Sequence, residues 1–357
     1  MAPIGEFSTV LLSGAAADRI GRFPVLLLGM AAASVLLVAA AATRDPWVLA
    51  GTNLGFGVAS GAILASSLAV VADEAGSDER GYEMGRFDAF NLLGWIGGFA
   101  VGFGLLDVLP NAELYLLFLG GSGLLALGVL LATLSVRGRT VVPSSTPFAL
   151  GRILRTVFRR DVLMVTLPWL VIYLLLGTVF VFLGTSANGA GIRPGILAAV
   201  IGGGGLLLLL TQPGFGRLAD RFGRMRMMVV GTIGFVGVLA GAALLAQFGA
   251  VPVLLAVVGV SAIPALAYGP AALAALADLA QTIPRATTMA IYSLVISLGM
   301  LTGLLVSTAL FSHYGANGLT AYFAGIAVAL VGLTWWRYDD VRRAKPPKTW
   351  VPTTPAR

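Results

Sequence analysis

A nine-residue charged motif occurs twice in this chain, each time between two long apolar stretches. Residues 14–22 read GAAADRIGR, and residues 216–224 read GRLADRFGR. Charged side chains are costly inside hydrocarbon, so both copies are expected at a membrane surface. A second group recurs in the same way: Ala72, Asp73, Arg80 and Met84 correspond to Ala277, Asp278, Arg285 and Met289. The offsets of 202 and 205 residues indicate a chain built from two related halves.

The apolar stretches predict an all-α polytopic membrane protein. Hydrophobic residues make up 58% of the chain and charged residues only 11%, whereas soluble domains carry about 25% charged residues. A membrane-spanning helix needs about 20 apolar residues. Ten spans are predicted at residues 24–43, 46–72, 89–106, 114–136, 162–187 and 194–216, with two each in 227–277 (divided near 248–252) and 286–336 (divided near 313–317). Residues 1–13 form an apolar stub that is too short to cross alone.

Lys and Arg are distributed unevenly between the two sides of this topology. With residues 14–22 in the cytoplasm, 21 of the 23 basic residues fall in cytoplasmic segments, as the positive-inside rule requires. The chain is therefore expected to cross the plasma membrane many times with a cytoplasmic C-terminus. Because this placement explains the net charge of +7, nucleic-acid binding is not needed to account for it.

The expected organisation has four parts. They are an N-terminal helical bundle at 1–136, a cytoplasmic central loop at 137–161, a C-terminal helical bundle at 162–336 and a cytoplasmic tail at 337–357. Apolar residues alternate with arginines near the end of the central loop, which predicts a basic helix lying in the membrane interface or a partner-binding helix. Subtracting the repeat offset from 162–187 puts a corresponding helix before residue 1, so the sequence predicts that one helix is missing from the first half.

The doubled motif resembles the signature of the major facilitator superfamily, which follows the second helix of that family and again the eighth. The resemblance implies two six-helix bundles, about five plus six helices here, around a central cavity that opens alternately to either side. It also implies a gating latch made by these residues: Gly14, Asp18, Arg19, Gly21, Arg22, Asp73, Arg80, Gly216, Asp220, Arg221, Gly223, Arg224, Asp278 and Arg285.

Specific contacts follow from that resemblance. Asp18 and Asp220 would meet the opposite bundle at the positive end of a helix. Arg22 would pair with Asp73 and Arg224 with Asp278, while Arg80 and Arg285 would cap the start of the helices that follow them. The contacts would close the cytoplasmic side when the cavity faces outward. The alternative is that these residues only set topology and loop geometry.

Few ionisable residues lie inside the predicted spans. Glu6 and Asp88 are the candidates for carrying a coupling proton, because an intramembrane acid is a functional candidate by default. Asp88 is also expected to form an interfacial ion pair with the nearby Arg86. The candidate substrate cavity is polar and aromatic, which suits a neutral or lipophilic solute. Its predicted residues are Asn53, Asn91, Trp95, Trp169, Tyr173, Gln212, Tyr268 and Tyr292.

Two antiporter features are incomplete in this sequence. The span at 46–72 contains no charge, whereas many proton-coupled members of the family carry an arginine there, and the glycine pattern at residues 94–102 has Phe99 where antiporters carry proline. The expected function is nevertheless secondary transport of a small solute by a monomer, with export favoured. Uptake or facilitated diffusion of a neutral metabolite, and a non-transporting sensor or scaffold, are the alternatives.

Other classes of function lack the residues that they require. The chain has no cysteine and one histidine, so neither a metal site nor a cofactor is predicted. No nucleophile–base pair suggests an enzyme, and no GxxxxGK[ST] loop suggests ATP-driven transport.

Overall fold

The computed structural model describes residues 2–76, 78–106, 111–135, 150–189, 194–248, 252–280 and 285–343, and their regular structure is entirely α-helical. The all-α class predicted from the sequence is confirmed. In chain order the helices are α1 (Ala2–Ile20), α2 (Arg22–Ala41), α3 (Pro46–Glu74), α4 (Arg80–Leu106), α5 (Asn111–Ser135), α6 (Leu150–Val157), α7 (Arg160–Gly189), α8 (Pro194–Phe222), α9 (Arg224–Phe248), α10 (Pro252–Ala265), α11 (Tyr268–Leu279) and α12 (Arg285–Arg343).

Six helical segments in the described ranges are long and apolar enough to cross a membrane. They are Arg22–Ala41, Pro46–Glu74, Arg160–Thr178, Arg224–Leu245, Pro252–Leu279 and Arg285–Trp336. The last segment bends at Gly315, whose φ of 58° and ψ of −140° are not helical. This bend divides α12 into two limbs, residues 285–314 and 316–343, where the sequence predicted a break. The break predicted near 248–252 also lies between two helices, α9 and α10.

Each copy of the repeated motif lies mostly in the last part of a helix and contains the glycine at which that helix ends. Helix α1 continues from the predicted stub through most of the first copy, as far as Ile20, and α8 continues through the second copy as far as Phe222. Only Gly21 and Gly223 leave the helix, with φ of 113° and 95°. Glycine adopts this region without the steric cost that a Cβ would bring.

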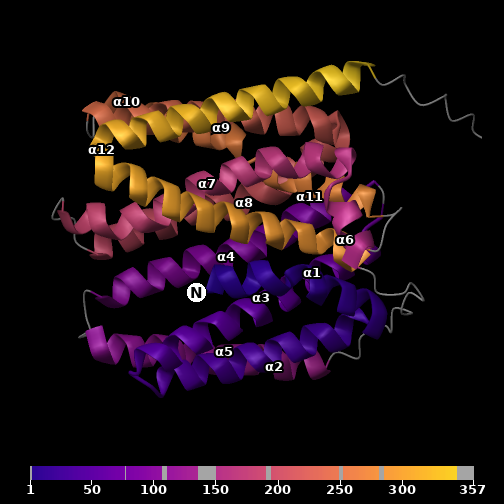
Figure 1. Ribbon diagram of the computed structural model, residues 1–357, viewed down its shortest axis with the longest axis vertical. Helices are drawn as coiled ribbons and strands as arrows, with labels where there is room; N and C mark the ends of the chain where they lie inside the picture. The colour runs from indigo at the N-terminus through magenta and orange to yellow at the C-terminus, as the bar shows by residue number, and fades with distance from the viewer. Residues whose placement is uncertain are drawn as a thin grey trace, which may run out of the picture.

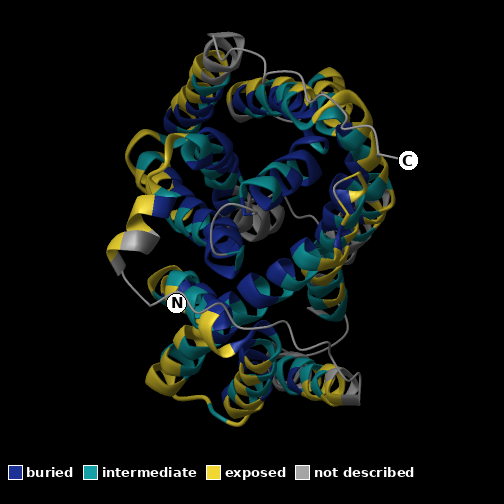
Figure 2. Ribbon diagram, turned by 90° about the vertical axis from the view of Figure 1, so that its right-hand side faces the viewer, coloured by how far each residue is buried: buried dark blue, intermediate teal, exposed yellow. Residues whose placement is uncertain are grey.

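The helices lie side by side in two groups, with α1–α5 in the lower part of Figure 1 and α7–α12 in the upper part. Figure 2 shows the same groups end-on. The groups meet where α4 runs along α8 and where α1 runs along the first limb of α12. Helix α6, the described part of the central loop, lies at one end of the molecule, and residues 136–149 and 344–357 are outside the described residues.

Glycines bring the two groups into close contact. A Cβ on Gly14 would stand 2.7 Å from the carbonyl oxygen of Ala286, and a Cβ on Gly85 would stand 2.8 Å from that of Gln212. Small residues permit such close approach between membrane helices, where dispersion and not the hydrophobic effect holds helices together. The two halves are therefore tightly packed at these points.

Candidate functional site: the interface between the two halves

Asp18 caps the N-terminus of a helix from the opposite half. Its carboxylate accepts hydrogen bonds from the backbone N–H groups of Ala286 and Thr287, at 3.0 and 2.8 Å, and from the Thr287 hydroxyl at 2.8 Å. The first N–H groups of a helix have no partner within it, and they carry the positive end of the helix dipole. Asp18 is 8% exposed, so water screens this interaction only weakly.

Asp220 makes the corresponding contact in the other direction. Its two carboxylate oxygens accept hydrogen bonds from the backbone N–H groups of Gly81, at 2.8 Å, and Tyr82, at 3.0 Å, at the start of α4. The guanidinium of Arg217 lies 4.3 Å from the centre of the Tyr82 ring, a cation–π distance. Each half of the molecule thus supplies an aspartate that caps a helix of the other half.

Asp73 and Asp278 each join two arginines. Asp73, in the last turn of α3, forms ion pairs with Arg22 of its own half and with Arg285 of the other half. Asp278, in the last turn of α11, forms ion pairs with Arg224 of its own half and with Arg80 of the other half, the latter at 2.5 Å. The within-half pairs are those that the sequence suggested.

The cross-half pairs correct the expectation for Arg80 and Arg285. Each stands at the start of a helix, as predicted, but its side chain pairs with the aspartate of the opposite half. Arg80 is 6% exposed, and it also donates to the carbonyl oxygen of Ala75 at 3.5 Å. The remaining charged members of the motif, Arg19 and Arg221, are exposed.

Asp88 is buried between the halves and does not pair with Arg86, contrary to the sequence-based expectation. Arg86 pairs with Glu83 at 3.1 Å, whereas Asp88 accepts a hydrogen bond from the Tyr292 hydroxyl at 3.2 Å. The Tyr173 hydroxyl donates in turn to the Tyr292 oxygen at 3.3 Å. These contacts form a chain of polar groups that runs from α4 through α12 to α7.

Glu6 is the second intramembrane acid, and it too bonds to α12. The Ser293 hydroxyl donates a hydrogen bond to its carboxylate. Ser293 follows Tyr292 directly, so both acids of the first half reach neighbouring residues of one helix in the second half. The sequence reasoning did not select Ser293 or Thr287. The repeat held a signal for Ser293, because the offset of 205 places it opposite Asp88.

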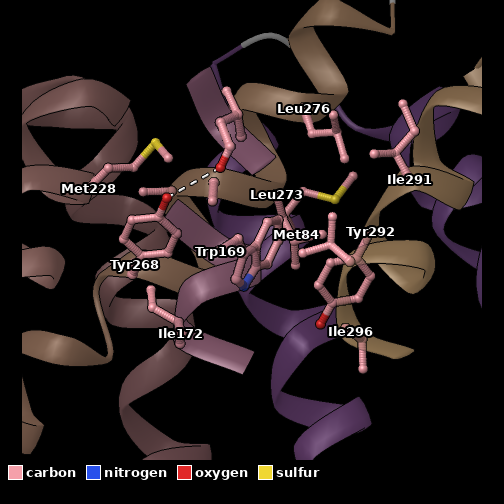
Figure 3. Close-up of a cluster of buried hydrophobic side chains, with 14 of the residues drawn as sticks. Met84, Trp169, Ile172, Met228, Tyr268, Leu273, Leu276, Ile291, Tyr292 and Ile296 are labelled. Carbon is pink, nitrogen blue, oxygen red and sulfur yellow. Dashed lines mark hydrogen bonds between the residues drawn. The ribbon is translucent and has the colours of Figure 1, made fainter. Parts of the chain in front are cut away.

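Four of the eight predicted cavity residues form an aromatic cluster: Trp169, Tyr173, Tyr268 and Tyr292. Trp169 packs between Tyr268 and Tyr292 in a closed cluster (Figure 3), with its ring centre 4.6 Å from that of Tyr292 and 6.3 Å from that of Tyr173. Trp169, Tyr268 and Tyr292 are buried, and Tyr173 is half-buried.

The other predicted residues lie elsewhere. Asn91 and Trp95 line a cleft of about 660 Å³ beside α4. The side chain of Asn53 accepts a hydrogen bond from the backbone N–H of Ala2 at 2.7 Å. Gln212 is 3% exposed, and its side-chain oxygen has no hydrogen-bond partner among the described residues. Within the same residues no group of three or more His, Cys, Asp or Glu could hold a metal ion.

The sequence was compared with known families and proteins. The family model described as Major Facilitator Superfamily matches residues 2–190 and 183–356. A protein of Lactococcus lactis, "Multi-drug resistance efflux pump PmrA homolog", is 24% identical over 237 residues, which cover 62% of this chain and 55% of that protein. The chain thus spans about half the length of the curated relative that it matches.

Solved structures with the same fold come from several transporters. The human organic anion transporter MFSD10 (TETRAN) has a TM-score of 0.74 at 20% identity, covering 93% of this chain and 82% of that one. The proton:xylose symporter XylE has a TM-score of 0.70 at 16% identity, covering 95% and 84%. The E. coli fucose:proton symporter FucP has a TM-score of 0.66 at 12% identity, covering 94% and 88%.

At these identities the solved structures establish the fold, and the family model, which matches nearly the whole chain, establishes the family. Both match transporters and not enzymes. The chain belongs to the Major Facilitator Superfamily and is a multi-pass membrane protein.

Proposed function

We propose that this protein moves a small neutral or lipophilic solute across the plasma membrane by alternating access, with export as the direction. We further propose that the cytoplasmic side is closed in this structure. The observation that carries the proposal is the reciprocal capping of helices: Asp18 caps α12 and Asp220 caps α4, and each cap joins one half to the other. A rigid scaffold has no need of two equivalent contacts that must break together.

The strength of these contacts fits a reversible latch. A hydrogen bond to a charged group stabilises a structure by about 1.5–3 kcal/mol net, and the cross-half ion pairs of Asp73 and Asp278 add to the four backbone bonds of the caps. Moving an equilibrium from 1:99 to 99:1 requires about 5.5 kcal/mol. The latch therefore opens only when substrate, a proton and the contacts made in the open state together offset most of this free energy.

Glu6 and Asp88 are proposed as the groups that couple transport to protons. Each carboxyl group bonds to α12 across the interface in the closed state. When the halves separate, the hydroxyls of Ser293 and Tyr292 move away and water reaches the acids. The carboxyl groups of Glu6 and Asp88 then have different proton affinities in the closed state and in the state with the halves separated. This difference is the condition for coupling proton binding to the conformational change. The relative named as a multi-drug efflux pump supports export.

Proton-coupled uptake is the second candidate, because two of the similar structures are proton symporters of sugars. A single assay distinguishes export from uptake. Proteoliposomes that hold the protein are given an inward or outward pH gradient, and the movement of ethidium or Nile red is followed. Accumulation opposite to the proton flow supports export, and accumulation with the proton flow supports uptake.

Distance measurements test alternating access without knowledge of the substrate. The chain has no cysteine, so spin labels can be placed at exposed positions: Ile20 and Phe222, which end α1 and α8, and Trp47 and Val253, which lie near the starts of α3 and α10 at the other end. We expect two distance populations for each pair, with opposite changes when the pH is altered. A single unchanged distance for both pairs, with no dye movement, would contradict the proposal and favour a static protein.

A further inference from the structure

Gln212 lies where α8 packs against α4, at one of the places where the two halves meet (Figure 1). A Cβ on Gly85 of α4 would stand 2.8 Å from the backbone carbonyl oxygen of Gln212. The glutamine is only 3% exposed, and its side-chain oxygen is buried without a hydrogen-bond partner among the described residues. Buried polar atoms in native proteins nearly always have a partner, so this exception calls for a physical reason.

The repeat shows that the fold does not require a polar residue at this position. The offset of 202 relates Gln212 to Val10 of α1. Val10 is fully buried in one cluster with Ala290 of α12, and the offset of 205 relates Ala290 to Gly85. The contact between α1 and α12 is therefore apolar at this level, whereas the contact between α8 and α4 holds an amide. Glycine at the facing position has no side chain that could bond this amide.

Several other polar residues buried in the described helices are satisfied within their own helix. The Thr232 hydroxyl of α9 donates to the carbonyl oxygen of Met228 at 2.9 Å, and the Ser297 hydroxyl of α12 donates to that of Ser293 at 2.7 Å. These hydrogen bonds stay intact when helices move relative to one another, because both partners belong to one helix. Gln212 has no such internal bond for its side-chain oxygen, so its hydrogen bonding depends on what lies across the interface.

We infer that Gln212 opposes closure of the cytoplasmic side and thereby keeps the proposed latch reversible. An unpaired amide in a buried contact raises the free energy of the closed state. When the halves separate, water enters between α4 and α8 and supplies the missing hydrogen bonds. The penalty thus exists in the closed state only, where it offsets part of the stabilisation by the Asp18 and Asp220 caps. In this role Gln212 is a positioning residue, and the role rests on the alternating access proposed above.

A substitution that removes the amide but keeps the length of the side chain tests this inference. Gln212→Met is such a change, because methionine is unbranched, apolar and adaptable in shape. With spin labels at Ile20 and Phe222, we expect the ratio of closed to open molecules to rise about tenfold relative to the protein that keeps Gln212. We also expect the melting temperature to rise by about 2–4 °C, and dye transport to slow because the open state is populated less.

The control variant is Thr232→Val, which removes a buried hydroxyl that is bonded within its own helix and should leave the ratio unchanged. A second background extends the test. Asp18→Asn is expected to open the cytoplasmic end, and addition of Gln212→Met should restore the short distance between the labels at Ile20 and Phe222. A closed fraction that stays the same or falls on addition of Gln212→Met, in either background, would overturn the inference, because the amide would then have a partner in the closed state.

Distances and dye movement report separately on Gln212 and on transport. Dye movement with an unchanged ratio of closed to open molecules would remove this role of Gln212 and leave the proposed transport. A shifted ratio without dye movement would leave the role of Gln212 and contradict transport. A single distance in all of these variants would overturn both.

Discussion

Arg80 of α4 and Asp278 of α11 form an ion pair of 2.5 Å across the two halves of the protein. The repeat-related pair, Arg285 with Asp73, joins the same halves in the opposite sense. Each aspartate also holds an arginine of its own half, Arg224 or Arg22. The charges that fix each half internally are therefore the same charges that hold the halves together. Separation of the halves changes the partners of both carboxylates at once.

Loss of the charge on Asp18 should open the cytoplasmic end. Asp18→Asn keeps the shape of the side chain but removes the charge that meets the α12 dipole, which contributes up to about 2 kcal/mol at a partly buried site. We expect spin labels at Ile20 and Phe222 to move toward longer distances. The matched control is Asp45→Asn, because Asp45 accepts the N–H groups of Trp47 and Val48 within its own helix. An unchanged Ile20–Phe222 distance in Asp18→Asn would remove Asp18 from the latch.

Asp73 should matter more for stability than either arginine that it binds. Asp73→Asn leaves two arginines without their ion-pair partner, and removal of one partner of a buried pair costs about 3–5 kcal/mol. Arg285→Gln should cost less, because the Arg285 side chain is 34% exposed and Asp73 retains Arg22. The measurement is thermal unfolding in detergent of the two single variants and of the variant that carries both Asp73→Asn and Arg285→Gln, which together form a double-mutant cycle. Additive effects of the two substitutions would show that the pair is not coupled.

The position of Asp88 should depend on a glycine in the other half. A Cβ on Gly269 would stand 2.7 Å from the Asp88 carboxylate. Gly269→Ala should therefore destabilise the closed state by about 1–3 kcal/mol, as overpacking of a tight site does. Gly259→Ala, with open space around it among the described residues, should have little effect. Asp88→Ser should restore the melting temperature of Gly269→Ala, and failure to do so would place the clash elsewhere.

Glu6 should set the pH dependence of transport. In the protein made in its own membrane, Glu6→Gln keeps an acceptor for the Ser293 hydroxyl but cannot release a proton. We expect the rate of dye transport by this variant to be independent of pH. The variant and the unmodified protein are measured side by side between about pH 5 and 8. Glu83→Gln is the control, because Glu83 pairs with Arg86 at the surface. Full retention of the pH dependence in Glu6→Gln would exclude Glu6 as the coupling group.

The residues of the proposed latch could be selected from the sequence because the motif is repeated and resembles the family signature, and the pairings within each half were implied by that resemblance. Each copy of the motif places an aspartate in the last turn of a helix, just before a glycine whose positive φ ends that helix. The offset then relates Asp73 to Asp278 without any knowledge of packing. The partner of Asp88 could not be predicted in this way. Arg86 is the nearest charge in sequence, but the helix directs Asp88 toward Tyr292, 204 residues away.

The sequence by itself indicated the two related halves, the apolar segments long enough to span a membrane and the glycines at which helices end. These properties follow from hydropathy, from the cost of charge in lipid and from backbone sterics, which act over a few residues. The tertiary structure decided which half each charged side chain contacts. It also decided that Gly299 and Gly303 lie against the backbone of α7. Such contacts depend on how helices far apart in the chain pack together.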